Sequence, residues 1–356
     1  MFNKPAGTFN ASYTKDEAIV RTRTQWGLLI ILVGILAVVP YYGPLASDYW
    51  INFLIYVAIT VISVQGLNIL TGYCGQISLG QAAFMAVGAY TTAILSSKAG
   101  WPFLACLPMA GLMATAVGFI FAIPAVRVKG FYLAITTLAA HFVIIYLIIS
   151  LEFTGGSIGI YIERPRIGSI IFDSPQSFYM LVIGVTIVMT VFAKNIVRTK
   201  VGWAFIAIRD NDLAAKVMGV NPFTYKLLAF SISAFYAGIA GSLLVYHLQF
   251  AHPEHYGLTQ AIWLLGILIV GGMGSINGAI FGSIFVRLID EITNIHISPA
   301  LGNLFPSLAG QMSAALGLLV FTAIVGIFII YEPRGLSHRW QLLKASYRLW
   351  PFSYWT

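Results

Sequence analysis

Charged side chains are scarce in this chain. Only 9% of its 356 residues are Asp, Glu, Lys or Arg, whereas 59% are hydrophobic. Soluble globular domains carry about 25% charged residues. A chain this apolar requires lipid as part of its solvent, so its composition excludes an ordinary soluble domain. The formal net charge of +8 does not indicate a nucleic-acid partner, because the basic residues gather in a few segments between apolar runs.

Cysteine and catalytic motifs are also missing. Cys74 and Cys106 both lie in apolar runs, and two such residues provide neither a disulfide framework nor a Cys/His metal pattern. The chain has no G-x-x-x-x-G-K-[ST] phosphate loop, no nucleophile elbow and no H-E-x-x-H motif. We therefore expect a chain that is not an enzyme, holds no cofactor of its own and does not split ATP.

Three histidines near one another raise the question of a metal site. His247, His252 and His255 lie beside Glu254 in a segment expected to face the outside. Their spacing matches no strong zinc pattern, so a solvated loop is the favoured interpretation and no metal is expected.

Long apolar runs are what the sequence has in abundance. A bilayer-spanning helix needs about 20 mostly apolar residues. We expect an all-α fold, a polytopic membrane helix bundle of about ten transmembrane helices. The expected cores are 26–39, 50–70, 73–96, 101–123, 131–150, 178–193, 227–249, 259–271, 275–290 and 310–331. The eighth and ninth are short and are compatible with re-entrant or broken helices.

The basic residues indicate the orientation. If the N-terminus is cytoplasmic and the chain alternates, 16 of the 20 Lys and Arg residues fall in cytoplasmic segments and three fall outside, while Arg287 stays in a helix. Both termini are therefore expected in the cytoplasm. Residues 1–25 contain no apolar stretch of the kind found in a signal peptide and form an N-terminal tail, 26–335 form one membrane domain, and 336–356 form a C-terminal tail.

Two connections are too long to be simple turns. The outer loop, about 151–177, contains turn signals such as Gly155-Gly156. The inner loop, about 194–226, contains an amphipathic stretch from Trp203 to Met218 that we expect to form one helix. Gly219 and Pro222 then end it, as glycine and proline do beyond helix C-termini.

The segment from Gly72 to Gln81 places three glycines and two glutamines at membrane depth. Polar groups and irregular backbone are costly there unless they face protein or a water-filled path. We predict that Gln76, Ser78 and Gln81 face the translocation path, since interrupted helices build transporter sites. The alternative is that they only bond neighbouring helices.

Other spans contribute small residues and one histidine. His141 in the fifth span either bonds a partner helix or lines the path. The small residues let helices approach closely, which is packing and not chemistry. They are Ala82, Ala86, Ala89 and Ala93, then Gly238 and Gly241, then Gly274, Gly278 and Gly282.

Several motifs occur in an order that resembles the permeases of branched-chain amino acid ABC importers, the LivH/LivM type. They are Gly72-Tyr73-x-Gly75-Gln76-x-Ser78-Leu79-Gly80-x-Ala82-x-Phe84-x-x-x-Gly88-Ala89-Tyr90, Arg127 to Leu138, Thr154-Gly155-Gly156, Ala229 to Gly241, Gly271 to Ser275, and Pro333-Arg334-Gly335-Leu336. The resemblance covers about 50–335. The Arg127 block and the Thr-Gly-Gly turn point to the LivM-like half of the pair.

The resemblance implies a bacterial inner-membrane complex. It would hold a second, LivH-like permease, two ABC ATPase subunits that carry ATP and Mg²⁺, and an extracytoplasmic solute-binding protein. Tyr90, in the first motif, would join the path residues. The ATPases would meet a coupling helix formed by Arg209, Asp210, Asp212, Ala214, Ala215 and Gly219. The binding protein would dock on Glu163, Arg164 and Arg166.

The resemblance leaves the solute open. The family also serves urea, short amides and aromatic acids. This chain has Asp212-Leu213 where the family often has a glutamate before the paired alanines.

Two rival functions come from other classes. A stand-alone secondary transporter or channel predicts acidic residues for ion coupling inside the membrane. No Asp or Glu lies in the middle of an expected span, which counts against it. A membrane-embedded enzyme would need a catalytic cluster, and none is recognisable.

Overall fold

The computed structural model describes residues 23–41, 47–128, 130–167, 170–293, 295 and 309–349. Helices dominate this part of the chain, which confirms the predicted all-α class. The described strands have two residues each. β1 (Ile160–Tyr161) pairs antiparallel with β4 (Phe250–Ala251), and β2 (Arg166–Ile167) pairs antiparallel with β3 (Ile170–Ile171). Most of the expected N-terminal tail lies outside the described residues.

The long helices follow the apolar runs of the sequence. In chain order they are α2 (Arg23–Val38), α3 (Asp48–Leu67), the π-helix η2 (Asn68–Tyr73), α4 (Gln81–Ser97), α5 (Phe103–Ala125), α6 (Phe131–Ser150), α7 (Pro175–Arg198), α10 (Pro222–Leu248), α11 (Leu258–Gly271), α12 (Ile276–Ile292), α14 (Ala309–Tyr331) and α15 (Gly335–Leu349). The short ones are η3 (Glu152–Thr154), α8 (Lys200–Asp210), α9 (Asp212–Val217) and η4 (Pro253–Tyr256).

The number of single helices that are long enough to cross a membrane is lower than the expected ten. Among the described residues, five are long and apolar enough to span a membrane, or seven if each bent pair counts as one span. Each expected segment does contain a helix. However, α4 has only 17 residues, and α11 and α12 meet at a bend of 116°. This bend agrees with the expectation that 259–271 and 275–290 form a broken or re-entrant pair.

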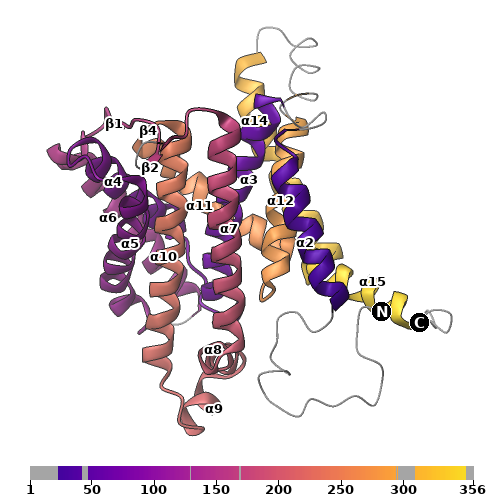
Figure 1. The fold of residues 1–356 in the computed structure, drawn as a ribbon. Helices are drawn as coiled ribbons and strands as arrows, with labels where there is room; N and C mark the ends of the chain where they lie inside the picture. Colours follow the sequence, from indigo (N-terminus) through magenta and orange to yellow (C-terminus); the bar gives the residue numbers. More distant parts are fainter. Residues whose placement is uncertain are drawn as a thin grey trace.

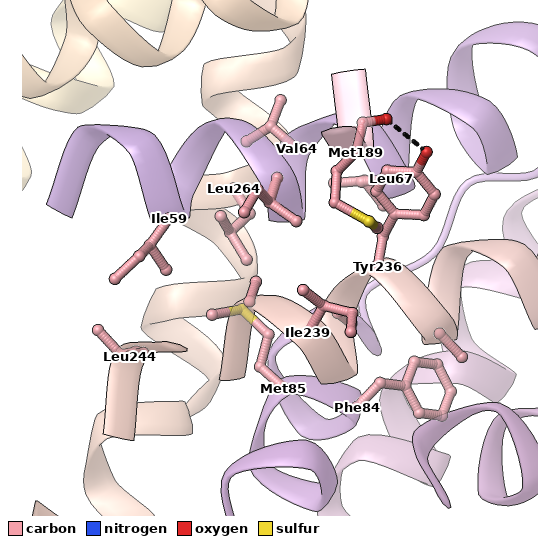
Figure 2. Close-up of a cluster of buried hydrophobic side chains, with 14 of the residues drawn as sticks. Ile59, Val64, Leu67, Phe84, Met85, Met189, Tyr236, Ile239, Leu244 and Leu264 are labelled. Carbon is pink, nitrogen blue, oxygen red and sulfur yellow. Dashed lines mark hydrogen bonds between the residues drawn. The ribbon is translucent and has the colours of Figure 1, made fainter. Parts of the chain in front are cut away.

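α3 and α10 form the centre of the bundle (Figure 1). In their most apolar stretches 83% and 78% of the residues are buried, against 22–39% for α5, α6 and α7, whose outer faces are left for lipid or a partner. Figure 2 shows side chains of this core, where the Tyr236 hydroxyl donates to the Met189 carbonyl oxygen at 2.8 Å.

Small residues let α4 and α10 pack backbone to backbone, as the sequence predicts. A Cβ on Gly88 would lie 2.3 Å from the carbonyl oxygen of Gly238, and one on Gly241 would lie 1.9 Å from that of Met85. Both distances are far below any normal contact, so only glycine fits. Ala82, Ala86, Ala89 and Ala93 are all fully buried.

The connections gather at the two ends of the bundle. The strands lie at one end, whereas α8, α9, the start of α2 and α15 lie toward the other (Figure 1). The expected C-terminal tail is thus helical over Gly335–Leu349.

The inner loop holds two helices, so the prediction of one helix over Trp203–Met218 is wrong. α8 ends at Asp210 and α9 starts at Asp212, with Asn211 extended between them at φ −157° and ψ 108°. The Asn211 side-chain oxygen accepts from the backbone N–H groups of Leu213 and Ala214, at 3.0 Å each. Asparagine is a strong N-cap, so it restarts the helix instead of continuing it.

Candidate functional site

The central helix α3 ends in an irregular stretch. The six residues that follow it form the π-helix η2, where the Cys74 N–H donates to the Ile69 carbonyl oxygen at 3.1 Å. π-turns inside helices occur frequently at functional sites. Gly75, at φ 72°, then turns the chain back. Gln81 starts α4 and bonds to Ser63, so the segment between them returns into the bundle beside α3.

The returning segment turns its polar side chains inward. Gln76 is 8% exposed and Ser78 1%, whereas Ile77 between them is 46% exposed. The Gln76 amide donates to the Cys74 carbonyl oxygen at 3.1 Å, and the Ser78 hydroxyl accepts from the Gly80 N–H at 3.2 Å. These predicted path residues therefore satisfy the irregular backbone, and Ile77 is the side chain that this segment presents outward.

Gln81 joins three helices. Its Nε2 donates to the Ser63 carbonyl oxygen of α3 at 2.9 Å, and its Oε1 accepts from the Ser233 hydroxyl of α10 at 2.9 Å. The side chain is 1% exposed. This is the geometry of helix-to-helix bonding, which was the alternative interpretation of Gln81.

Tyr90 lies apart from the Gln76 segment, whereas His141 lies one turn after Thr137, whose hydroxyl accepts from the Leu79 N–H at 3.0 Å. Tyr90 is about 13 Å further along α4 by the helical rise, and its hydroxyl donates to the Ala251 carbonyl oxygen of β4 at 3.3 Å. His141 on α6 is 1% exposed, and its Nδ1 has no hydrogen-bond partner among the described residues. The five predicted path residues are all buried.

Arg209, at the end of α8, faces the helix break. Its Nη1 donates to the Gly72 carbonyl oxygen at 3.2 Å, while its Nε and Nη2 lie 3.0 and 2.9 Å from Asp210 Oδ1. A Cβ on Gly75 would lie 2.8 Å from the Arg209 side chain. The inner loop is thus bonded directly to η2.

Asn68 was missed by the sequence reasoning. Its Oδ1 accepts from the Gly274 N–H at 2.8 Å, and its Nδ2 donates to the Ser275 carbonyl oxygen at 2.9 Å. Both partners belong to the turn between α11 and α12. A lone asparagine in an apolar span was the available signal, since such a side chain needs partners in the membrane.

The remaining coupling residues divide into two groups. Ala215 is 4% exposed and packs within the chain, and Asp212 pairs with the buried Lys226 at 3.2 Å. Asp210, Ala214 and Gly219 are exposed. Gly219 has φ 88°, and the Val220 and Gly219 N–H groups bond back to the Ala215 and Lys216 carbonyl oxygens in a Schellman motif.

The apolar residues predicted for the inner-loop helix fall into a buried group and an exposed group. Phe205 and Ile208 are 0% and 3% exposed, so they belong to the core of this chain. Leu213, Val217 and Met218 are 71%, 86% and 83% exposed. The most exposed apolar side chains of the inner loop therefore lie on α9 and the residue that follows it, and Trp203 on α8 is also 67% exposed.

The predicted docking residues of the outer loop are exposed. Glu163, Arg164 and Arg166 lie at the strand end of the bundle, where Arg164 pairs with Asp173 at 3.2 Å. The loop is anchored below them by the Ile162 N–H, which donates to the Gln249 carbonyl oxygen at 3.0 Å. Arg164 and Asp173 border a recess that also contains Tyr246 and His247.

The described residues contain no group of three His, Cys, Asp or Glu side chains that could hold a metal ion. The rings of His252 and His255 lie 5.8 Å apart at the outer end.

Comparison with known proteins decides the family. A family model described as "Branched-chain amino acid transport system / permease component" matches residues 49–330. The chain belongs to this family. The branched-chain amino acid permease protein LivM of Escherichia coli K12 is 33% identical over 288 residues, which cover 74% of this chain and 68% of that one.

The match to more distant relatives covers a smaller share of both chains. A probable LivM of Methanocaldococcus jannaschii is 24% identical, over 64% of this chain and 66% of its own length. The autoinducer 2 import permease LsrC of Escherichia coli O9:H4 is 32% identical, over 42% of this chain and 44% of its own. No solved structure matches the chain. This LivM-like chain is thus a multi-pass permease subunit of an ABC importer.

Proposed function

We propose that this permease carries branched-chain amino acids, or small polar solutes like them, across the bacterial inner membrane. The solute named for its LivM relatives supports this choice. The LsrC relatives are named for a different solute, so urea, short amides and aromatic acids stay as alternatives within the family. Uptake by the reconstituted complex, measured with each solute class in turn, tests the choice. Uptake of amides or aromatic acids without leucine uptake would contradict it.

One observation carries the ATP-driven mechanism. Leu213, Val217 and Met218 form an exposed apolar patch on a helix outside the bundle, at the end opposite the strands. Uncovered apolar surface of this kind marks a protein contact. The neighbouring Asp210 and Lys216 supply a charged rim. We propose that this patch, Leu213–Val217–Met218, docks on an ABC ATPase subunit.

The same proposal places the other partners. A LivH-like second permease would complete the transmembrane part, and two ATPase subunits would bind ATP and Mg²⁺. The solute-binding protein would dock on Glu163, Arg164 and Arg166 at the strand end, beside the recess with Tyr246 and His247. Both termini would be cytoplasmic, since the start of α2 and α15 lie toward the end that carries α8 and α9.

The permease needs weak contacts along its path, because a solute must leave as readily as it enters. Closure of the ATPases on ATP would move α8 and α9 and rock the bundle between outward- and inward-facing states. A channel or secondary transporter would have no use for the patch on α9.

Charge substitution in the patch tests the docking proposal. Leu213→Glu with Val217→Glu should release the ATPase subunits on purification and abolish ATP-dependent uptake in proteoliposomes. Lys200→Gln, an exposed change at the start of α8 and outside the patch and its rim, should do neither. Retained ATPase binding in the double variant, or uptake by the permease pair without ATPases, would overturn the proposal. Ala215→Glu is a poor test, because Ala215 packs inside its own chain.

Reporter fusions test the orientation. Fusions at Thr356 and at Ser169 should report opposite sides of the membrane, with Thr356 inside. The same side for both would exclude the proposed map.

A further inference from the structure

Three interruptions of the helical backbone meet at the end of the bundle that carries α8. They are η2 at the end of α3, the turn between α11 and α12, and the junction between α8 and α9. Arg209 joins the first to the third through its bond to the Gly72 carbonyl oxygen at 3.2 Å. Asn68 joins the first to the second through bonds of 2.8 and 2.9 Å to Gly274 and Ser275.

Glycines bring these segments into backbone contact. A Cβ on Gly72 would lie 2.3 Å from the Gly274 nitrogen and 2.1 Å from the Asn68 side-chain oxygen. A Cβ on Gly274 would lie 3.2 Å from Arg209 Nη1. Backbone contact joins η2 to the turn between α11 and α12, and the Arg209 side chain joins both to the end of α8. A displacement of one is therefore passed to the next, since packed protein is nearly incompressible.

Arg209 is built to act as a rigid link. Asp210 holds its Nε and Nη2 from one side, which leaves Nη1 directed at Gly72. The Arg209 side chain is 39% exposed, and its planar guanidinium makes both contacts at once, which a lysine ammonium does not do in the same geometry. Its acceptor belongs to the last turn of a helix, where carbonyl groups lack helical partners.

We propose that Arg209 is a positioning residue for transport: it passes the movement of α8 and α9 to η2 and, through Asn68, to the bend between α11 and α12. This inference rests on the proposed docking of α9 on an ATPase. It gives Arg209 a role inside the chain that the sequence interpretation did not include, whereas Asp210 stays exposed. It also gives the π-helix η2 a role, as the segment at the end of α3 that changes its backbone conformation during transport.

Site-specific labels can follow the movement directly. The two cysteines of this chain, Cys74 and Cys106, are buried, so a single introduced cysteine can be labelled with a fluorophore. Trp203→Cys would report on α8, where residue 203 is 67% exposed and lies outside the proposed docking patch. Met273→Cys would report on the turn between α11 and α12, where residue 273 is 52% exposed. A non-hydrolysable ATP analogue added to the full complex should change both signals.

Arg209→Gln should separate the two signals. The label at 203 should still respond to the analogue, whereas the label at 273 should not. Uptake per ATP hydrolysed should fall about tenfold, a typical size for a lost coupling between sites. Lys200→Gln, which removes an exposed cation from the same helix, should leave both signals and the uptake ratio unchanged. Arg209→Lys should behave like Arg209→Gln.

The outcomes are distinguishable. A normal response at 273 with a normal uptake ratio in Arg209→Gln would overturn the inference. So would loss of ATPase binding in this variant alone, because Arg209 would then be a docking residue. If the wild-type permease binds no ATPase, the proposed function itself fails. Should Arg209→Gln unfold, Asn68→Asp decides: it should silence only the label at 273, and a normal signal there would overturn the inference.

Discussion

The guanidinium of Arg287 lies 4.2 Å from the centre of the Tyr56 ring. Arg287 belongs to α12 and Tyr56 to α3, so this contact joins the bent helix pair to the central helix. The Arg287 Nε also donates to Thr60 at 3.3 Å, and its Nη1 lies 3.9 Å from Asp290. Thr60 lies near the middle of the 26-residue helix formed by α3 and η2, so this charge is buried at membrane depth.

Removal of this buried charge should destabilise the bundle. Arg287→Met would end the contact with Tyr56 and the bond to Thr60, and would leave Asp290 without its partner. Breaking a buried ion pair from one side costs about 3–5 kcal/mol, and Asp290 is partly exposed, so we expect the lower end. The midpoint of thermal unfolding in detergent should fall by several degrees. Arg339→Met, which breaks an exposed pair with Glu332, should change it little. Equal shifts in the two variants would contradict the assignment.

The two glutamines of the helix break should respond differently to substitution. Gln81→Leu would leave the buried Ser233 hydroxyl without its acceptor, at a cost of about 1–3 kcal/mol. Adding Ser233→Ala should restore part of that stability, because both polar groups are then gone. Thermal unfolding of the single and double variants measures this coupling. Strict additivity would show that the bond contributes nothing.

Gln76→Leu remains the test of the path hypothesis. The Gln76 amide bonds only to its own segment, at Cys74, so its loss should affect the local backbone more than helix packing. We expect lower uptake with normal complex assembly. Unchanged uptake in Gln76→Leu and Gln81→Leu combined would assign both residues to packing.

The close contact of α4 and α10 should not tolerate a methyl group. Gly241→Ala would place its Cβ 1.9 Å from the Met85 carbonyl oxygen, so the two helices would have to separate. Overpacking of this kind costs about 1–3 kcal/mol. Yield in the membrane and thermal unfolding should both fall. Gly184→Ala, with no atom near the new methyl group, is the matched control and should be neutral or slightly stabilising.

The residue after α9 needs a left-handed backbone. Gly219 has φ 88° and open space around it, so a substitution there tests backbone strain alone. Gly219→Val should cost about 1–2 kcal/mol, shift α9 and weaken ATPase binding. Gly219→Asn should stay close to wild type, because asparagine tolerates this conformation. Copurification of the ATPase with each variant is the measurement, and equal binding by both would exclude a role for the cap geometry.

The sequence by itself determined the class, the helical segments and the family. Each expected apolar core contains a helix, because about 20 apolar residues in lipid have few other ways to satisfy their backbone. The short lengths of 259–271 and 275–290 were enough to suggest the bend of 116°. Gly219 has the positive φ that is typical of a glycine placed directly after the last turn of a helix.

Only the tertiary structure decided which way the polar residues face. Helical periodicity shows that Arg209, Asp212 and Ala215 lie on an inner-loop helix, but it does not show what covers each face. The partners are distant in sequence: Arg209 bonds Gly72, and Asn68 bonds Gly274 and Ser275. Contacts across such separations depend on how whole helices pack. For that reason residues predicted to face an ATPase or a solute were found bonded within the chain, and the link from α8 to the helix breaks became visible only in the folded structure.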